Sequence, residues 1–173
     1  VIDSMKGRGS DFTVYLTLPI AENQNVDKQA LEEERAVESF DYQGMHILMA
    51  EDNEVNAEIA VSILEMNGAK VDTVVDGQQA IEQFEVCPPG TYDFILMDIQ
   101  MPVMDGRTAS RAIRAMNRPD AKTIPIFALS ADVEDQRLSA ESGMNGHFSK
   151  PIDFEKMKKE IGKILIKGKR VGA

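Results

Sequence analysis

From residue 44 onward, short apolar runs alternate with segments in which apolar residues recur every three or four positions. Short apolar runs bounded by turn residues predict buried strands, and the longer 3.6-residue period predicts helices. The runs that predict strands are 45–50, 70–75, 92–97, 123–129 and 147–149. The segments that predict helices are 53–68, 76–86, 106–117, 132–142 and one that begins at residue 154. The pattern therefore indicates five strands that alternate with five helices.

Two of these strands, DFILM (93–97) and IPIFAL (124–129), are apolar on both faces. This is expected when helices cover both sides of a parallel sheet. Right-handed crossovers leave few topologies, and a flavodoxin-like, doubly wound α/β sheet of order 2-1-3-4-5 fits best. We expect residues 44–167 to form this one domain, followed by a short tail at 168–173.

The chain before residue 44 has a different pattern. Residues 11–20 alternate as a strand does and stop at Pro19, so we interpret 1–20 as the last piece of a preceding domain. Residues 21–43 contain seven acidic side chains against two basic ones and few large apolar residues. This composition predicts an acidic linker, partly helical from Asp27 to Ser39.

Composition narrows the function classes. The net charge of −10 over 173 residues argues against binding to nucleic acid, whose phosphates would be repelled. One cysteine and two histidines exclude an intrachain disulfide and disfavour a zinc cluster, and a reducing cytoplasm is the simplest location. Because no apolar run approaches the roughly 20 residues of a membrane-spanning helix, we expect this fragment to make no membrane contact.

Candidate chemistry gathers at the strand ends, where open parallel sheets bind ligands. Glu51 and Asp52 follow the first strand, Asp98 ends the third, Ser130 the fourth and Lys150 the fifth. Carboxylates that share a site repel each other unless they hold a proton or a cation, and an all-oxygen set suits Mg²⁺. Lys150 and Ser130 suit phosphoryl oxygens, which leaves Asp98 as a carboxylate nucleophile that forms an acyl phosphate.

Each of these residues taken alone has an ordinary structural explanation. An aspartate or serine after a strand often caps the next helix, and a single lysine is usually solvated. The favourable interaction of acids with a helix N-terminus explains a Glu-Asp pair about as well as chemistry does. Their joint occurrence at four strand ends, in order, favours a functional site.

The motifs at these strand ends, taken with the segments beside them, resemble the receiver domain of two-component response regulators, from Gly44 to about Lys167. The matching pieces are ILMAEDNEVN, VVDGQQAIEQF, DFILMDIQMPVMDG, PIFALSA and GHFSKPID. The resemblance implies that Asp98 is the phosphoacceptor and that Asp52 and Asp98 ligate Mg²⁺, with Mn²⁺ as an alternative cation. It further implies that the backbone carbonyl of Gln100 is a ligand and that Glu51 acts through water.

By the same resemblance, Ser130 and Lys150 would bind the phosphoryl group, and the Lys150–Pro151 peptide bond would be cis. Ser130 and His147 would form the conformational switch. Gln100 and Asp132 would flank the site of water attack and influence the phosphoryl lifetime.

Three positions depart from the commoner family pattern. Glu51 stands where many receivers have Asp, and its longer side chain makes direct metal contact doubtful. Ser130 replaces Thr, which keeps the hydroxyl and loses a methyl group. His147 replaces an aromatic residue and would add pH sensitivity, although an ordinary edge-strand histidine without a switching role explains it equally well.

The first residues, SMKGRGSDFTVYLTLPI, resemble the end of a histidine-kinase ATP-binding domain, with Gly7, Gly9 and Ser10 as its last glycine box. The chain would then be the C-terminal part of a hybrid sensor histidine kinase. This expectation is compatible with a parent kinase that is anchored in the inner membrane. The implied partners are the kinase phosphodonor domain and a histidine phosphotransfer domain. The candidate docking residues are Asn53, Val55, Asn56 and Ile59.

The resemblance implies a phosphoacceptor that assists its own phosphorylation and dephosphorylation. Three alternatives remain. A phosphatase with an aspartate nucleophile would need a second acid where this chain has Gln100. A flavodoxin-type FMN binder would need a Ser/Thr/Gly-rich phosphate loop where this chain has EDNEVN. A degenerate receiver that acts only as a binding module would not need the complete acidic set.

Overall fold

The computed structural model describes residues 2–5, 9–12, 32, 35–131 and 135–171. The chain divides into two units, residues 1–31 and 32–173. In the first unit, β1 (Ile2–Met5) pairs with β2 (Gly9–Phe12) in an antiparallel hairpin. The strand predicted over 11–20 lies mostly outside the described residues, as does most of the predicted linker.

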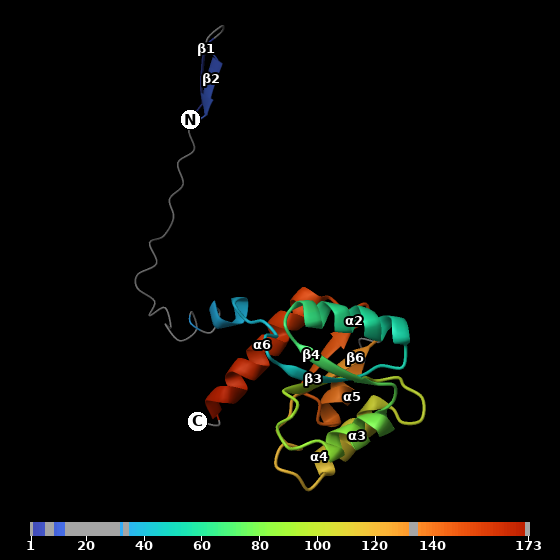
Figure 1. Ribbon diagram of the computed structural model, residues 1–173. Coiled ribbons are helices and arrows are strands. Elements are labelled where there is room, and N and C mark those ends of the chain that lie inside the picture. Colours follow the sequence, from blue (N-terminus) through green and yellow to red (C-terminus); the bar gives the residue numbers. More distant parts are fainter. Residues whose placement is uncertain (1, 6–8, 13–31, 33–34, 132–134, 172–173) are drawn as a thin grey trace. The chain divides into compact units, whose positions relative to one another are not determined.

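The second unit is built on a parallel sheet of five strands in the order β4-β3-β5-β6-β7 (Figure 1). Renumbered from the first strand of this unit, the order is 2-1-3-4-5, so the predicted topology is confirmed. The strands are β3 (His46–Ala50), β4 (Lys70–Val74), β5 (Phe94–Asp98), β6 (Ile126–Ser130) and β7 (Gly146–Ser149).

Helices cover both faces of the sheet. They are α2 (Glu54–Met66), α3 (Gly77–Val86), α4 (Gly106–Ala115), α5 (Asp135–Glu141) and α6 (Phe154–Val171). Figure 1 shows α2 and α6 on one side of the sheet and α3 and α4 on the other. Within the described residues, no helix combines the length and the apolar character needed to cross a membrane.

The central strands explain the two-layer core. Every residue of β5 is buried, and its side chains alternate between the two faces. Ile95 and Met97 belong to the cluster that includes Phe84 of α3 and Ile113 of α4. Phe94, Leu96 and their neighbours belong to the cluster that includes residues of α2 and α6. A strand buried on both faces therefore carries the run of apolar residues up to Asp98.

The folded unit begins before Gly44. Tyr42, in the predicted linker, is 2% exposed, and its ring centroid lies 6.1 Å from that of Phe94. Phe40 packs edge-on against Tyr42, with 5.5 Å between ring centroids. A side chain at Gly162 of α6 would collide with the Phe40 ring, since an added Cβ would lie 2.9 Å from its Cγ. The end of the acidic segment is therefore part of the core.

Three large apolar residues of α2 (Glu54–Met66) face outward. Val55, Ile59 and Met66 are 63%, 52% and 86% exposed. The buried side of this helix consists instead of Ala60 and Leu64. The helical period thus predicts the helix correctly, but Val55, Ile59 and Met66 remain available at the surface.

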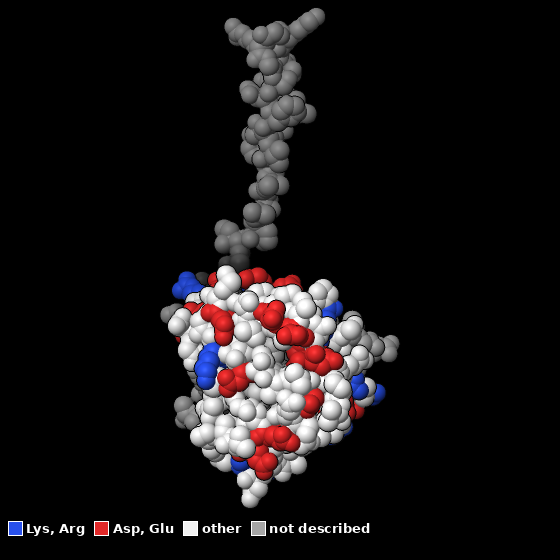
Figure 2. Space-filling view, turned by 45° about the vertical axis from the view of Figure 1, so that its right-hand side comes forward, with Lys and Arg blue, Asp and Glu red and all other residues white. Residues whose placement is uncertain are grey.

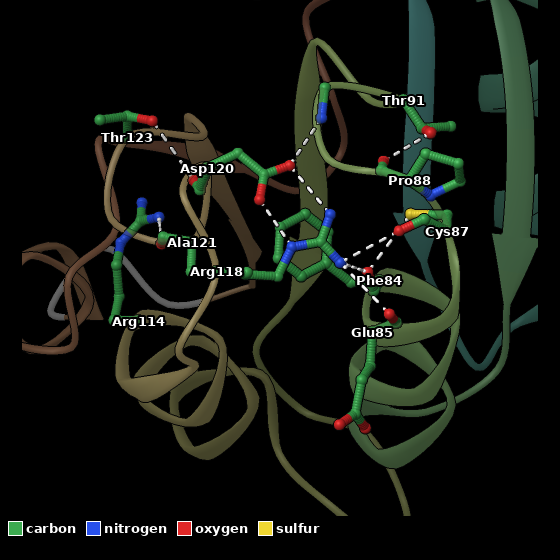
Figure 3. Close-up of polar contacts among 11 residues, drawn as sticks. Phe84, Glu85, Cys87, Pro88, Thr91, Arg114, Arg118, Asp120, Ala121 and Thr123 are labelled. Carbon is green, nitrogen blue, oxygen red and sulfur yellow. Dashed lines mark hydrogen bonds and ion pairs between the residues drawn. The ribbon is translucent and has the colours of Figure 1, made fainter.

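Arg118, in the loop after α4, contacts the end of α3 (Figure 3). Its guanidinium donates to both carboxylate oxygens of Asp120, at 2.6 and 2.9 Å, and lies 4.0 Å from the centroid of the Phe84 ring. It also donates to the carbonyl oxygens of Phe84, Glu85 and Cys87 at the end of α3. Asp120 in turn accepts from the backbone N–H of Gly90 at 2.8 Å. We call these residues the Arg118 cluster.

Candidate functional site

The strand ends bring the acidic residues together. Glu51 and Asp52 directly follow β3, and Asp98 is the last residue of the neighbouring strand β5. One carboxylate oxygen from each of the three lies within 4.8 Å of the others. Glu51 and Asp98 are buried, at 3% and 4% exposure, and Asp52 is exposed. The site is therefore a cluster of two buried acids and one exposed acid, and we call the space between their carboxylates the pocket.

Lys150, which follows β7, joins the two buried acids. Its Nζ lies 2.6 Å from Oδ2 of Asp98 and 2.7 Å from Oε2 of Glu51. The backbone N–H of Lys150 donates to the carbonyl oxygen of Ser130 at 2.7 Å, and the Lys150–Pro151 peptide bond is cis. One ammonium thus faces two carboxylates, which leaves an excess of negative charge in the pocket.

The pKa shifts reflect this arrangement. Burial raises the pKa of Asp98, and the charge of Glu51 acts in the same direction, against the Lys150 ammonium and the Gln100 N–H. Burial alone would lower the pKa of Lys150, but its hydrogen bonds with Asp98 and Glu51 outweigh this and raise it. Lys150 therefore stays protonated at neutral pH, and a further cation would relieve the repulsion at Asp98.

The loop after β5 closes around Asp98. The backbone N–H of Gln100 donates to Oδ1 of Asp98 at 3.2 Å, and the N–H of Gly106 donates to the carbonyl oxygen of Ile99 at 3.0 Å. A Cβ at Gly106 would overlap the carbonyl oxygen of Asp98 and lie 2.7 Å from Cγ of Met97. Only glycine fits here, because the start of α4 passes directly against the end of β5.

The ligand set fits a hard divalent cation. Its charged donors are carboxylates alone, with neither histidine nor cysteine among them. The exposed position of Asp52 leaves one side of the pocket open to water or to phosphate oxygens. On the face shown in Figure 2, acidic side chains are more prominent than basic ones, in keeping with the negative net charge.

Ser130 and His147 occupy neighbouring strands on the far side of Asp98. Ser130 ends β6 and is 1% exposed. His147 pairs with Ala128 across β6 and β7, is half-buried, and lines a cavity of about 120 Å³ together with Met144 of the preceding loop. His147 is thus not part of the acidic cluster. Asp132 lies outside the described residues.

The predicted docking residues have two different environments. Val55 and Ile59 are exposed on α2. Asn53 caps this helix, since its Oδ1 accepts from the N–H of Asn56 at 3.1 Å. The amide of Asn56 reaches back to the pocket and donates to Oε1 of Glu51 at 3.0 Å. The sequence interpretation missed this contact, although the position of Asn56 in the first turn after Glu51 could have indicated it.

Comparison with known proteins identifies the same region. The profile of the response regulator receiver domain matches residues 47–162. The peroxide stress-activated histidine kinase mak1 of Schizosaccharomyces pombe is 35% identical over 150 residues, which are 83% of this chain and 9% of that protein. The aerobic respiration control sensor protein ArcB of Escherichia coli is 34% identical over 152 residues, which are 87% of this chain and 18% of that protein. The chain thus spans less than a fifth of either relative.

Solved structures of receiver domains are also similar to this chain. The receiver domain of sensor histidine kinase PA1611 from Pseudomonas aeruginosa, with magnesium coordinated in its active site cleft, is 36% identical. It aligns with a TM-score of 0.60 over 75% of this chain and 99% of that one. A chain of the Saccharomyces cerevisiae complex between the phosphotransfer protein Ypd1 and the receiver domain of Ssk1 is 27% identical, with a TM-score of 0.60 over 70% and 88% of the two chains. The profile match and the shared fold show that this chain belongs to the response regulator receiver domain family.

Proposed function

We propose that this chain accepts a phosphoryl group on Asp98 and passes it on within a phosphorelay. The observation that carries the proposal is the contact of a buried Asp98 with Lys150, 2.6 Å away, in a pocket that Glu51 and the exposed Asp52 complete. A buried nucleophile beside a fixed cation and an open acidic rim suits in-line transfer of a phosphoryl group.

In the proposed step, a carboxylate oxygen of Asp98 attacks the phosphorus atom of the donor. A new P–O bond forms, the bond between phosphorus and the histidine nitrogen or acetate oxygen of the donor breaks, and its electron pair leaves with that group. The Lys150 ammonium, held 2.6 Å from Asp98, balances charge on the phosphoryl oxygens. The Ser130 hydroxyl at the end of β6 donates a hydrogen bond to one of them.

The residues that would hold Mg²⁺ are Asp52 and Asp98 directly, Gln100 through its backbone carbonyl and Glu51 through water. Bound there, the cation supplies charge screening between the acids and the phosphoryl oxygens, and Mn²⁺ would serve in the same way. The carboxylate cluster supports this assignment, as does the magnesium coordinated in the PA1611 receiver.

The parent protein is proposed to be a hybrid histidine kinase, by analogy with mak1 and ArcB. The donor would then be a kinase phosphohistidine and the acceptor a histidine phosphotransfer domain, the class of protein that Ypd1 represents. Exposed Val55 and Ile59 offer an apolar docking surface beside the pocket, with Asn53 and Asn56 at its edge. Aliphatic groups of this kind suit a helical partner face.

Three further residues are assigned to control of the phosphorylated state. Gln100 and Asp132 flank the position from which water would attack and tune the lifetime of the acyl phosphate. His147 is assigned with Ser130 to the conformational switch. The cavity of about 120 Å³ beside His147 supports this role, because it leaves space for the imidazole to change position.

The test is intact-protein mass spectrometry after incubation with acetyl phosphate. Wild-type protein in Mg²⁺ should gain one phosphoryl group, and the same protein in EDTA should gain none. The isosteric variant Asp98→Asn should stay unmodified while it keeps its fold. Equal modification of this variant would show that Asp98 is not the acceptor.

Docking requires a separate comparison. Ile59→Ser should slow transfer to a histidine phosphotransfer domain and leave labelling by acetyl phosphate unchanged, because the aliphatic side chain of Ile59 offers neither a charge nor a hydrogen bond to the phosphoryl group. Thr123→Ser, an exposed change on a distant loop, is the matched control. Equal transfer rates for Ile59→Ser and wild type would place the docking surface elsewhere.

A further inference from the structure

Both carboxylate oxygens of Glu51 are held, each by a different element. Oε2 pairs with Nζ of Lys150 at 2.7 Å, and Oε1 accepts from Nδ2 of Asn56 at 3.0 Å. The Glu51 side chain is 1% exposed, so bulk solvent does not compete freely with these two partners. Asn56 thus stands at one end of a chain of contacts that runs through Glu51 and Lys150 to Asp98.

Asn56 itself is anchored independently of the pocket. It lies in the first turn of α2, and its backbone N–H is bound by the capping side chain of Asn53 at 3.1 Å. Its amide therefore projects from a fixed helix end. Glutamate has one more rotatable bond than aspartate, and the second partner on Oε1 removes that additional freedom.

We propose that Asn56 is a positioning residue for the phosphoryl-transfer site: it fixes the carboxylate of Glu51 and so shapes the cation pocket between Glu51, Asp52 and Asp98. The role of Asn56 in phosphoryl transfer rests on the proposed function, whereas its contacts with Glu51 and Asn53 are observed within this chain. This role does not depend on contact with a partner protein.

The first test measures Mg²⁺ affinity by isothermal titration calorimetry, without any phosphodonor. Asn56→Ala removes the amide, and Asn56→Leu removes it while keeping a side chain that branches at Cγ. Both variants should raise the Mg²⁺ dissociation constant by roughly fivefold, the factor that corresponds to one hydrogen bond. Asn67→Ala, which removes an amide bonded to Ile63 at the other end of α2, should leave the affinity unchanged.

A double-mutant comparison separates positioning from a general effect on the helix. Glu51→Asp withdraws the carboxylate from the amide, so adding Asn56→Ala to this variant should change Mg²⁺ affinity by less than about twofold. An equal loss in both backgrounds would show that Asn56 acts independently of Glu51 and would overturn the proposal.

Phosphorylation by acetyl phosphate distinguishes a positioning role of Asn56 from a docking role. Asn56→Ala should also require more Mg²⁺ for half-maximal labelling by acetyl phosphate, although no partner protein is present. If the variant binds Mg²⁺ and labels as wild type does, and only transfer to a phosphotransfer domain is slowed, Asn56 is a docking residue alone and the inference fails. Absence of labelling in wild type, with the Mg²⁺ affinities as expected, would overturn the proposed phosphoacceptor function and leave the positioning role intact.

Discussion

The Arg118 cluster should contribute a large share of the stability of the second unit. Its guanidinium makes two hydrogen bonds with Asp120, stacks on Phe84 and binds carbonyl oxygens at the end of α3. The side chains of Arg118 and Asp120 are 11% and 18% exposed, so the pair is largely shielded from water. Arg118→Ala removes all of these contacts at once and also leaves helix carbonyls without their donor.

The magnitude follows from the separate contacts. Hydrogen bonds to charged groups contribute about 1.5–3 kcal/mol, and a cation over an aromatic ring contributes about 0.5–2 kcal/mol. These contributions are not additive within one network, so we expect Arg118→Ala to lower the free energy of unfolding by about 3 kcal/mol. Arg118→Lys keeps the charge but loses the planar pairing with Asp120, and should cost about half as much.

Urea denaturation followed by circular dichroism measures this difference. With a denaturant slope of about 2 kcal/mol per molar urea, the midpoint of Arg118→Ala should fall by about 1.5 M. Lys122→Ala, on the same loop, is exposed and should change stability by less than about 0.5 kcal/mol. A loss below about 1 kcal/mol in Arg118→Ala would refute the reasoning, because it would reduce the cluster to an ordinary surface ion pair.

Three further variants test other parts of the structure. Arg118 lowers the pKa of Asp120, so the ionised carboxylate stabilises the fold above the unfolded-state pKa of about 3.9, and this stabilisation is lost as the pH falls. Asp120→Asn should therefore lower the free energy of unfolding at pH 7, as measured by urea titration. The difference in stability between this variant and wild type should narrow below about pH 4. Tyr42 buries a hydroxyl with no hydrogen-bond partner in the described residues, so Tyr42→Phe should raise the thermal midpoint slightly, whereas Tyr42→Ala should cost about 3–5 kcal/mol; a destabilised Phe variant would contradict this. Gly106→Ala should cost more than about 2 kcal/mol and slow labelling of Asp98; wild-type stability would show that the backbone yields there.

Most of the sheet follows from the sequence for a simple reason. Strands such as β5 and β6 are buried on both faces, so each is an uninterrupted apolar run between turn residues. In a parallel sheet all such strands end at the same edge, which brings Asp98 and Lys150 together without any knowledge of packing. The part of the site determined by topology was therefore predictable.

Details that depend on packing could not be predicted from the sequence. The residues Val55, Ile59, Ile63 and Met66 have the same spacing whether they face the core or solvent. In the structure Ile63 is half-buried and the other three are exposed, and the buried residues of α2 are Ala60 and Leu64. The composition around Tyr42 is acidic and resembles a linker, yet the rings of Tyr42 and Phe40 pack that segment against the core.

Side-chain contacts between elements could not be predicted from the hydrophobic pattern either. The bond from Asn56 to Glu51 depends on the rotamers of two polar residues, about which hydrophobic periodicity says nothing. Asp76 lies two residues after the end of β4, and no functional role was predicted for it. In the structure it caps α3 by accepting from the N–H of Gln79 at 2.8 Å.

The central claim is that Asp98 becomes an acyl phosphate, and chemical mapping of that bond tests it most directly. After incubation with acetyl phosphate and Mg²⁺, borohydride reduction converts an aspartyl phosphate to homoserine, which peptide mass spectrometry locates. We predict homoserine at position 98 in the Mg²⁺ sample and unmodified aspartate in the EDTA sample. Homoserine at Asp52 or at any other acid, or none in phosphorylated protein, would contradict the account.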